Sequence, residues 1–242
     1  MSFFSDIRFF EEVPSTQDVL KEALRAGAAS EGLLVRAGRQ TGGRGRHGRT
    51  WVSDAGNLYL SLLLRPGCDA REIGIFSLLA GLGVYQAARA FLSSEEGLQL
   101  KWPNDLLLGG RKCAGILLET DLSAQGLVEA LMVGVGVNLA CAPEEGAALN
   151  DFASVPVTPE AFQDVFLEKI EALYAAWRDG QNAEILERWL AAAHPKGTPL
   201  SVKIGSDIRQ GRFYGLDGQG NLILSLDGNR LQTITAGDVY LT

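Results

Sequence analysis

The densest group of chemically useful residues is a glycine- and arginine-rich stretch. Five of the 22 basic residues of this 242-residue chain lie within fourteen positions that contain no acid: Arg36, Arg39, Arg44, Arg46 and Arg49. Guanidinium groups bind carboxylates and phosphates through paired donors, and backbone N–H groups of a glycine-rich loop can face a phosphate. The stretch therefore favours binding of a small anion. A mobile, solvated basic loop and an arginine–glycine tether for nucleic acid are open alternatives.

The same stretch contains a G-x-G-x-x-G pattern at Gly43, Gly45 and Gly48. A dinucleotide-binding fingerprint must open a helix, so that the helix N-terminus meets the pyrophosphate. Residues 50–57 lack a helical pattern, and an apolar strand follows them. We therefore reject the dinucleotide fingerprint and expect an anion-binding loop.

A second motif is Lys-Trp-Pro-Asn-Asp at residues 101–105. Pro103 cannot donate to a strand ladder, so the chain must break there, which can turn the next two side chains towards a site. Asp105 is a candidate ligand for magnesium or a ribose, because hard cations prefer carboxylate oxygens. Lys112 follows a Gly-Gly turn and begins a predicted buried strand, which would hold it rigidly for catalysis. The alternative is an ordinary turn with a capping Asp and a surface Lys.

A third motif is Gly134-Val-Gly136-Val-Asn138 at the end of a predicted strand. Glycines inside a strand often mark close approach by a ligand or another backbone. Tight packing of a helix on the strand is the alternative. No Ser/His/Asp nucleophile set is suggested, because His47 is the only histidine near a candidate site.

Overall composition limits the classes of protein that are possible. The formal net charge of −7 argues against a protein that coats nucleic acid or an anionic membrane. Cys68, Cys113 and Cys141 are isolated, which indicates buried thiols in a reducing compartment and neither a disulfide framework nor a zinc site. The N-terminus has no signal-peptide pattern and no apolar run is long enough to span a bilayer. We expect a soluble, cytoplasmic protein.

The pattern of strands and helices predicts an α+β fold. A mixed, mostly antiparallel sheet with helices on one side is expected up to a linker at 141–160 and two further helices. After Pro199, five short strand-like pieces separated by Gly, Asp and Asn turns predict a small β-barrel. We therefore expect two domains, residues 1–195 and residues 196–242.

The order of the motifs resembles the biotin–protein ligases (biotin–[acetyl-CoA-carboxylase] ligases). The resemblance covers essentially the whole chain and rests on Ser15-Thr16-Gln17, GRGRHGRTW, KWPND, RKCAGILLE, GVGVN and the β-rich tail. It is to the monofunctional class, which lacks the N-terminal helix-turn-helix repressor domain. The family fold that it implies is a class II synthetase-like catalytic domain followed by an SH3-like β-barrel.

The resemblance also implies roles for single residues. Gln17 stands where the family more usually has Asn, and the arginine loop of relatives is disordered until ligand binds, so we expect a mobile loop. Catalytic roles fall on Lys112, Arg46 and Arg44, and a magnesium contact falls on Asp105. Biotin contacts are implied for Ser15, Thr16, Gln17, Gln40, Arg44, Gly45, Arg46, Lys112 and Gly115. ATP contacts are implied for Arg46, Arg49, Trp51, Asn104, Asp105, Lys112 and Asn138.

The implied reaction activates biotin with ATP as biotinyl-5′-AMP and transfers it to a lysine of a biotin carboxyl carrier domain. ATP and Mg²⁺ are expected as co-substrate and ion, with no tightly bound metal. No membrane or DNA binding is expected, and a homodimer through an edge of the sheet is possible. A lipoate–protein ligase, which shares the adenylation logic, is the nearest alternative. A non-enzymatic nucleic-acid binder that uses the arginine loop is an alternative of another class.

Overall fold

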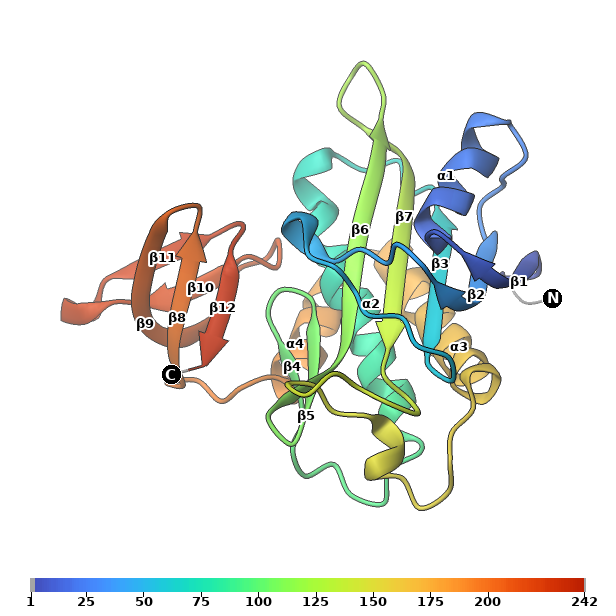
Figure 1. The fold of residues 1–242 in the computed structure, drawn as a ribbon. Helices are drawn as coiled ribbons and strands as arrows, with labels where there is room; N and C mark the ends of the chain where they lie inside the picture. The colour runs from blue at the N-terminus through green and yellow to red at the C-terminus, as the bar shows by residue number, and fades with distance from the viewer. Residues whose placement is uncertain (1–2, 242) are drawn as a thin grey trace.

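The computed structural model describes residues 3–241, which form a large α+β domain and a smaller β domain (Figure 1). The large domain is built on a seven-stranded sheet of order β1-β2-β3-β7-β6-β5-β4. Only the β1–β2 pair is parallel among these strands, so the sheet is mixed and mostly antiparallel, as expected. The strands are β1 (Ile7–Val13), β2 (Leu34–Gln40), β3 (Leu58–Leu64), β4 (Leu98–Lys101), β5 (Asp105–Leu108), β6 (Arg111–Leu122) and β7 (Val128–Val137).

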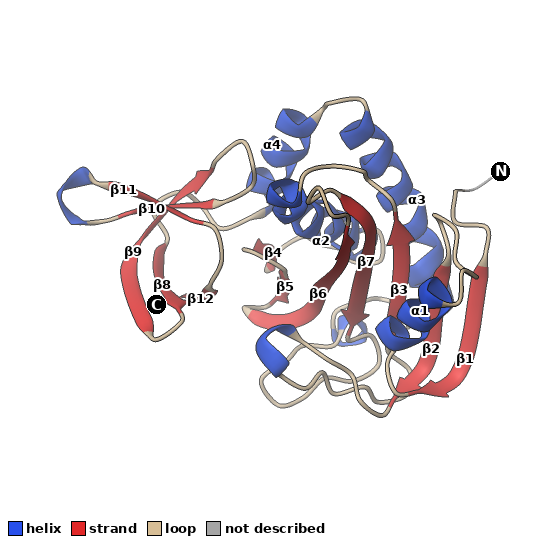
Figure 2. Cartoon of the chain, turned by 90° about the horizontal axis from the view of Figure 1, so that it is seen from above, coloured by secondary structure: helices blue, strands red, loops and turns tan. Residues whose placement is uncertain are grey.

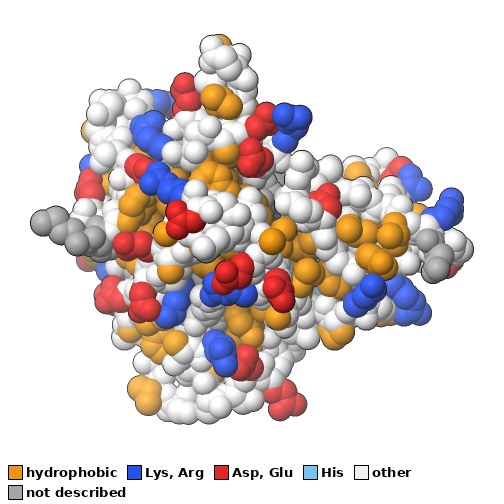
Figure 3. Space-filling view, turned by 180° about the vertical axis from the view of Figure 1, so that it is seen from behind, with side chains coloured by type: hydrophobic (Ala, Val, Ile, Leu, Met, Phe, Trp, Pro, Cys, Tyr) orange, Lys and Arg blue, Asp and Glu red, His pale blue; other side chains and the backbone are white. Residues whose placement is uncertain are grey.

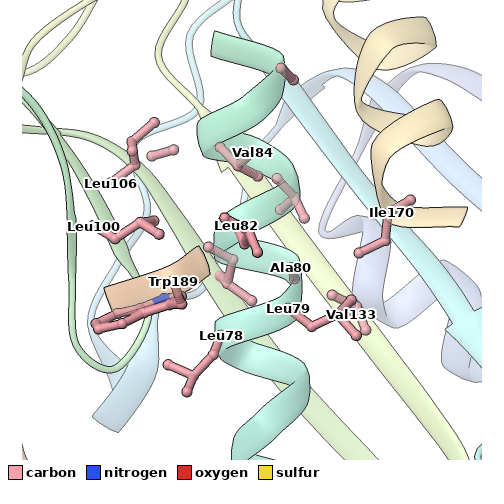
Figure 4. Close-up of a cluster of buried hydrophobic side chains, with 14 of the residues drawn as sticks. Leu78, Leu79, Ala80, Leu82, Val84, Leu100, Leu106, Val133, Ile170 and Trp189 are labelled. Carbon is pink, nitrogen blue, oxygen red and sulfur yellow. The ribbon is translucent and has the colours of Figure 1, made fainter. Parts of the chain in front are cut away.

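Three helices cover one face of this sheet: α2 (Ile73–Arg89), α3 (Pro159–Arg178) and α4 (Asn182–Ala192). They enclose the main core, in which Leu82, Ile170 and Trp189 from the three helices pack with strand residues such as Val133 (Figure 4). Helix α2 is buried almost all round, which matches its nearly uninterrupted apolar sequence. Short 3₁₀ turns occur at η1 (Arg46–Gly48), η2 (Ala70–Glu72), η3 (Leu149–Asp151) and η4 (Asp227–Asn229).

Helix α1 (Thr16–Arg25) lies on the opposite face of the sheet (Figure 2). Its Leu20 packs with Leu33, Leu63 and Met132 in a separate small core. Neighbours of these strand residues belong to the main core, because successive residues of a strand point to opposite faces. The expectation of helices on one side therefore holds for α2, α3 and α4, and α1 is the exception.

Residues after α4 form a five-stranded antiparallel sheet of order β11-β10-β9-β8-β12, the small β domain that the sequence predicts. Its buried residues Leu200, Val202, Phe213 and Leu224 belong to the same hydrophobic cluster as the main core. The strands are β8 (Pro199–Ile204), β9 (Asp207–Leu216), β10 (Leu222–Ser225), β11 (Leu231–Ile234) and β12 (Asp238–Leu241).

The β9–β10 turn docks the small domain on the large one. Gly220 has a φ of +81°, and a Cβ there would lie 2.6 Å from a methyl carbon of Leu78 on α2, so the turn requires glycine for both conformation and space. The carbonyl of Gly220 accepts a 2.9 Å hydrogen bond from the indole of Trp102. The small domain is therefore fixed next to the break between β4 and β5. Among the described residues, no helix is both long and apolar enough to cross a membrane.

Candidate active site

A cavity of about 630 Å³ lies between the central strands, the loop after β2 and the first residues of β12. All the site residues predicted from the sequence line this cavity, although they come from well-separated stretches of the chain. They are Ser15, Thr16, Gln17, Gln40, Arg44, Gly45, Arg46, Arg49, Trp51, Asn104, Asp105, Lys112, Gly115 and Asn138. Arg36 and Arg39 lie outside the cavity and pair with Glu160 and Glu12.

The break at Pro103 places Asn104 and Asp105 as the sequence suggests. Strand β4 ends at Lys101, a cis peptide bond joins Trp102 to Pro103, and β5 begins at Asp105. Asn104 is fixed on β6, because its side-chain amide donates to the carbonyl of Ile116 at 2.9 Å. Its side-chain oxygen is left to accept from the loop, at 3.2 Å from Arg46.

Asp105 lies between two lysines. Its Oδ1 is 2.6 Å from Lys112 Nζ and its Oδ2 is 3.0 Å from Lys101 Nζ, and its side chain is only 11% exposed. Burial acts to raise the pKa of Asp105, but the charges and hydrogen bonds of Lys112 and Lys101 outweigh it, so the pKa falls below its ordinary value. Asp105 is therefore ionised at neutral pH, and it holds both ammonium groups in the cavity wall.

This pairing bears on the predicted magnesium contact. A hard cation needs free oxygen ligands, whereas both oxygens of Asp105 are engaged by ammonium groups. Within residues 3–241, no three His, Cys, Asp or Glu side chains lie close enough together to hold a metal ion. As arranged, the residues around Asp105 do not fit a protein-held magnesium ion, and we assign no step to one.

The loop after β2 folds as a closed turn. The N–H of Gly45 donates to the carbonyl of Arg49 at 2.7 Å, and His47 adopts a left-handed conformation with φ of 56°. Only the single 3₁₀ turn η1 forms here before β3, so the loop opens no α-helix. Rejection of the dinucleotide fingerprint is therefore confirmed.

Arginines of this loop have different partners. Arg44 is 2.7 Å from Asp18 on α1 and 3.3 Å from Glu119 on β6, and the hydrogen bond with Asp18 is the main reason that its pKa is raised. Arg46 is more buried and donates to Asn104 and to the carbonyl of Gly237. Burial lowers the pKa of Arg46, although an arginine stays charged at neutral pH. Both hydrogen-bond acceptors of Arg46 are neutral, and the carboxylates of Asp238 and Asp105 attract its charge.

Another part of the cavity wall is neutral and polar. Gln40 accepts from the backbone N–H of Thr16 at 2.9 Å and donates to Ser53 at 3.1 Å, so its amide orientation is fixed. The side-chain amide of Gln17 donates to the carbonyls of Leu117 and Met132. The Oε1 atom of Gln17 is buried and has no partner among the described residues. A buried acceptor without a donor costs stability, which is the kind of feature that functional sites retain.

Glycines in the strands make room for side chains. A Cβ on Gly134 would lie 2.9 Å from the Gln17 amide, and a Cβ on Gly136 would lie 2.6 Å from the Trp51 indole. Because Gln17 belongs to α1, the contact at Gly134 supports the alternative in which a helix packs tightly on the strand. At Gly136, the missing side chain instead leaves room for the indole of Trp51 from the loop. Trp51 also lies against Gly115, and Lys112 Nζ is 5.3 Å from the centre of its ring.

Several lining residues escaped the sequence prediction, notably Lys101, Asp238 and Tyr240. Lys101 stands inside the KWPND motif and could have been selected from it. Asp238 and Tyr240 begin the strand β12, and no motif distinguishes them from other strand residues. The acidic pair Glu144 and Glu145, in the linker after β7, also lines the cavity.

Comparisons with known proteins show the family to which the chain is related. The model of the biotin/lipoate A/B protein ligase family matches residues 9–138, and that of the biotin protein ligase C-terminal domain matches residues 201–242. A biotin–[acetyl-CoA-carboxylase] ligase of Paracoccus denitrificans is 38% identical over 236 residues, covering 93% of this chain and 97% of the relative. One from Mycobacterium tuberculosis is 34% identical, covering 93% of this chain and 85% of the relative.

A solved structure has the same fold. Biotin protein ligase from Aquifex aeolicus in complex with biotin and ATP superposes with a TM-score of 0.83 at 28% identity, over 99% of each chain. The family models together cover most of the large domain and nearly all of the small one. On this evidence, the chain belongs to the biotin/lipoate A/B protein ligase family.

Proposed function

We propose that this chain activates biotin with ATP and transfers the biotinyl group to a lysine of a biotin carboxyl carrier domain. The enzyme is a biotin–[acetyl-CoA-carboxylase] ligase, as its relatives are. One observation carries the assignment of the reaction to this cavity. The neutral polar side chains of Thr16, Gln17 and Gln40 and the cationic side chains of Lys112 and Arg46 line one and the same cavity. Biotin has the same division, with a ureido head at one end and a carboxylate at the other.

In the first step, a carboxylate oxygen of biotin attacks the α-phosphorus of ATP. An O–P bond forms, the bond between the α-phosphorus and the bridging oxygen breaks, and pyrophosphate leaves. Both reactants are anions, so fixed positive charge must bring them together. Lys112, Arg46 and Arg44 supply that charge, and no protein nucleophile is required.

In the second step, the amine of the acceptor lysine attacks the acyl carbon of biotinyl-5′-AMP. A C–N bond forms, the C–O bond to the phosphate breaks, AMP leaves, and the amine releases a proton. The mixed anhydride is sensitive to water, so the loop that carries Arg44, Gly45 and Arg46 serves to cover it.

We assign the neutral end of the cavity to the biotin head. Ser15, Thr16 and Gln17 are buried, and Gln40 is fixed by Thr16, so these groups are pre-organised for a ureido ring. Gln17 is longer than Asn by one methylene, and the absence of a side chain at Gly134 accommodates that length. Gly115 leaves room for Trp51 and Lys112 to lie against β6, where they line the cavity.

We assign the opposite end to ATP. Arg46 and Arg49 face the phosphates, and Asn104, Asn138 and Trp51 complete the wall. Asp105 acts by holding Lys112 in place. Mg²⁺ enters with ATP as part of the co-substrate.

We propose three further properties. The domains divide between residues 195 and 196, because α4 ends at Ala192 and β8 begins at Pro199. The enzyme acts in the cytoplasm, which agrees with three free thiols and no disulfide among the described residues. It does not bind DNA, because the loop arginines Arg44 and Arg49 pair with carboxylates and because acidic and basic side chains mix across the back of the molecule (Figure 3).

A homodimer through the edge strand β1 is also proposed. Among the described residues, β1 pairs only with β2, and its Ile7, Phe9 and Phe10 are exposed. An unpaired edge with apolar side chains is a ready surface for a second strand. Sedimentation analysis of wild type and of a Phe9→Glu variant tests this. A wild-type monomer at all concentrations used would exclude the dimer.

The decisive experiment is incubation with biotin, MgATP and a biotin carboxyl carrier domain, read by mass spectrometry. We expect one biotinyl addition on a single lysine and biotinyl-5′-AMP when the carrier is omitted. A parallel reaction with lipoate and a lipoyl domain tests the nearest alternative. Lipoyl product without biotinyl product would overturn the assignment.

A further inference from the structure

The arginine loop is joined to the small β domain. The guanidinium of Arg49 forms an ion pair with the carboxylate of Asp238, at the first residue of β12. His47 Nε2 lies 3.8 Å from the other oxygen of Asp238. Arg46 donates to the carbonyl of Gly237 at 3.3 Å. Three residues of one loop, Arg46, His47 and Arg49, thus contact the adjacent residues Gly237 and Asp238 of the small domain.

These contacts hold the loop against a fixed partner. The β9–β10 turn is anchored on α2 and on Trp102 through Gly220, as described above. The first residues of β12 pair with β8, with Asp238 opposite Lys203. Asp238 is only 19% exposed, so its position in the small domain is well defined. A carboxylate held in this way can position a loop that has little secondary structure of its own.

Electrostatics explains why an acid is needed at this place. Arg46 is partly desolvated, and the nearby charge of Arg49 repels it. Asp238 supplies the largest attractive charge on Arg46 and also pairs with Arg49. One carboxylate therefore offsets the repulsion between two arginines that must share the cavity wall.

We propose that Asp238 is a positioning residue that holds the loop of residues 44–50 closed across the cavity and thereby retains the acyl-adenylate. This rests on the proposed function for the identity of the retained intermediate. The closure of the loop itself does not depend on that function. The small domain thus forms part of the cavity wall, since Asp238 and Tyr240 both line the cavity.

The first test needs no substrate. Trypsin cleaves after arginine, so cleavage after Arg44, Arg46 and Arg49 reports opening of the loop. We expect Asp238→Asn to be cleaved there about two- to fivefold faster than wild type, the size expected for loss of a partly screened ion pair. Asp207→Asn removes the same charge from an exposed site in the same domain outside the cavity, and should be cleaved at the wild-type rate. Equal cleavage of Asp238→Asn and wild type would overturn the proposal.

The second test measures the intermediate. Enzyme loaded with biotin and MgATP is separated from free ligand, and loss of biotinyl-5′-AMP is followed with time. We expect Asp238→Asn to lose it several-fold faster, Asp238→Glu to restore retention, and added NaCl to speed loss from wild type more than from Asp238→Asn. A wild type that forms no adenylate contradicts the proposed function only. Normal adenylate formation with unchanged retention in Asp238→Asn contradicts the positioning role only.

A folding check completes the design. Circular dichroism and thermal unfolding compare each variant with wild type. If Asp238→Asn does not fold, Arg49→Gln removes the same ion pair from the loop side, and cleavage after Arg46 still reports opening. Wild-type cleavage after Arg46 in that variant would overturn the proposal.

Discussion

Lys112 reaches Asp105 across the β5–β6 hairpin, with its Nζ 2.6 Å from Oδ1 of the carboxylate. The same carboxylate holds Lys101 at 3.0 Å. The Lys112 side chain is partly exposed, whereas that of Asp105 is nearly buried. A nearly buried carboxylate therefore holds in place the ammonium group that can contact a substrate. This relationship underlies the first two predictions.

Replacement of Lys112 by alanine should slow adenylate formation by roughly a hundredfold, the usual effect of losing one charged group that stabilises a phosphoryl-transfer transition state. The fold should survive, because Lys112 is not part of a core. Rapid-quench measurement of the first turnover provides the rate. Lys169→Ala, which removes a surface lysine paired with Glu168 on α3, is the matched control. A wild-type rate in Lys112→Ala would refute the catalytic role.

The Asp105 carboxylate should make a pH-dependent contribution to stability. Its folded-state pKa lies below the ordinary 3.8, so the contribution is fully present above the unfolded value and is lost as pH falls through the lower folded value. The difference in unfolding free energy between wild type and Asp105→Asn should therefore be constant near neutral pH and shrink below about pH 4. Urea unfolding at a series of pH values measures it. A difference that persists undiminished to pH 2 would contradict the ion-pair account.

Arg46→Gly should let the adenylate escape. The variant loses the hydrogen bonds to Asn104 and Gly237 together with the charge that faces the intermediate. Loss of charged hydrogen bonds predicts release roughly ten- to a hundredfold faster. Release is measured by retention of labelled biotinyl-5′-AMP on a size-exclusion column. Arg39→Gly, in a surface ion pair with Glu12, serves as the control, and equal retention in the two variants would reject the idea.

Gly136→Ala should damage the site through Trp51. The new methyl group would lie 2.6 Å from the indole, so the ring or the strand must shift. Overpacking of this kind costs about 1–3 kcal/mol of stability, and displacement of Trp51 should also lower activity. Gly218→Ala meets no atom within 4 Å and is the control. Thermal unfolding and adenylate formation are measured together. A Gly136→Ala variant identical to Gly218→Ala in both would show that the contact is dispensable.

Much of this architecture could be predicted because it is local. The apolar pattern of residues 72–92 corresponds to α2, the Gly-Gly turn with its flanking runs corresponds to the β5–β6 hairpin, and the turn-rich region after Pro199 is the small β domain. The motifs also led to residues that do share one cavity. Roles of single residues within that cavity remain predictions until they are measured.

What could not be predicted depends on contacts between distant residues. The stripe of Leu20, Ala23 and Leu24 indicates that α1 is amphipathic, yet it does not say which face of the sheet the helix covers. The ion pair between Arg49 and Asp238 joins residues 189 positions apart. In the sequence, nothing distinguishes Asp238 from any other acidic residue at the start of a strand. Periodicity and turn signals contain no information on such pairs.

The cavity wall also has a consequence for how the enzyme gains activity after synthesis or refolding. Its residues extend from Ser15 to Tyr240, so the site consists of contacts with long separations along the chain. Loop-closure entropy makes such contacts slow to form. During refolding, catalytic activity should therefore recover later than the helical circular dichroism signal. The delay between the two signals would measure the time that the two domains take to dock.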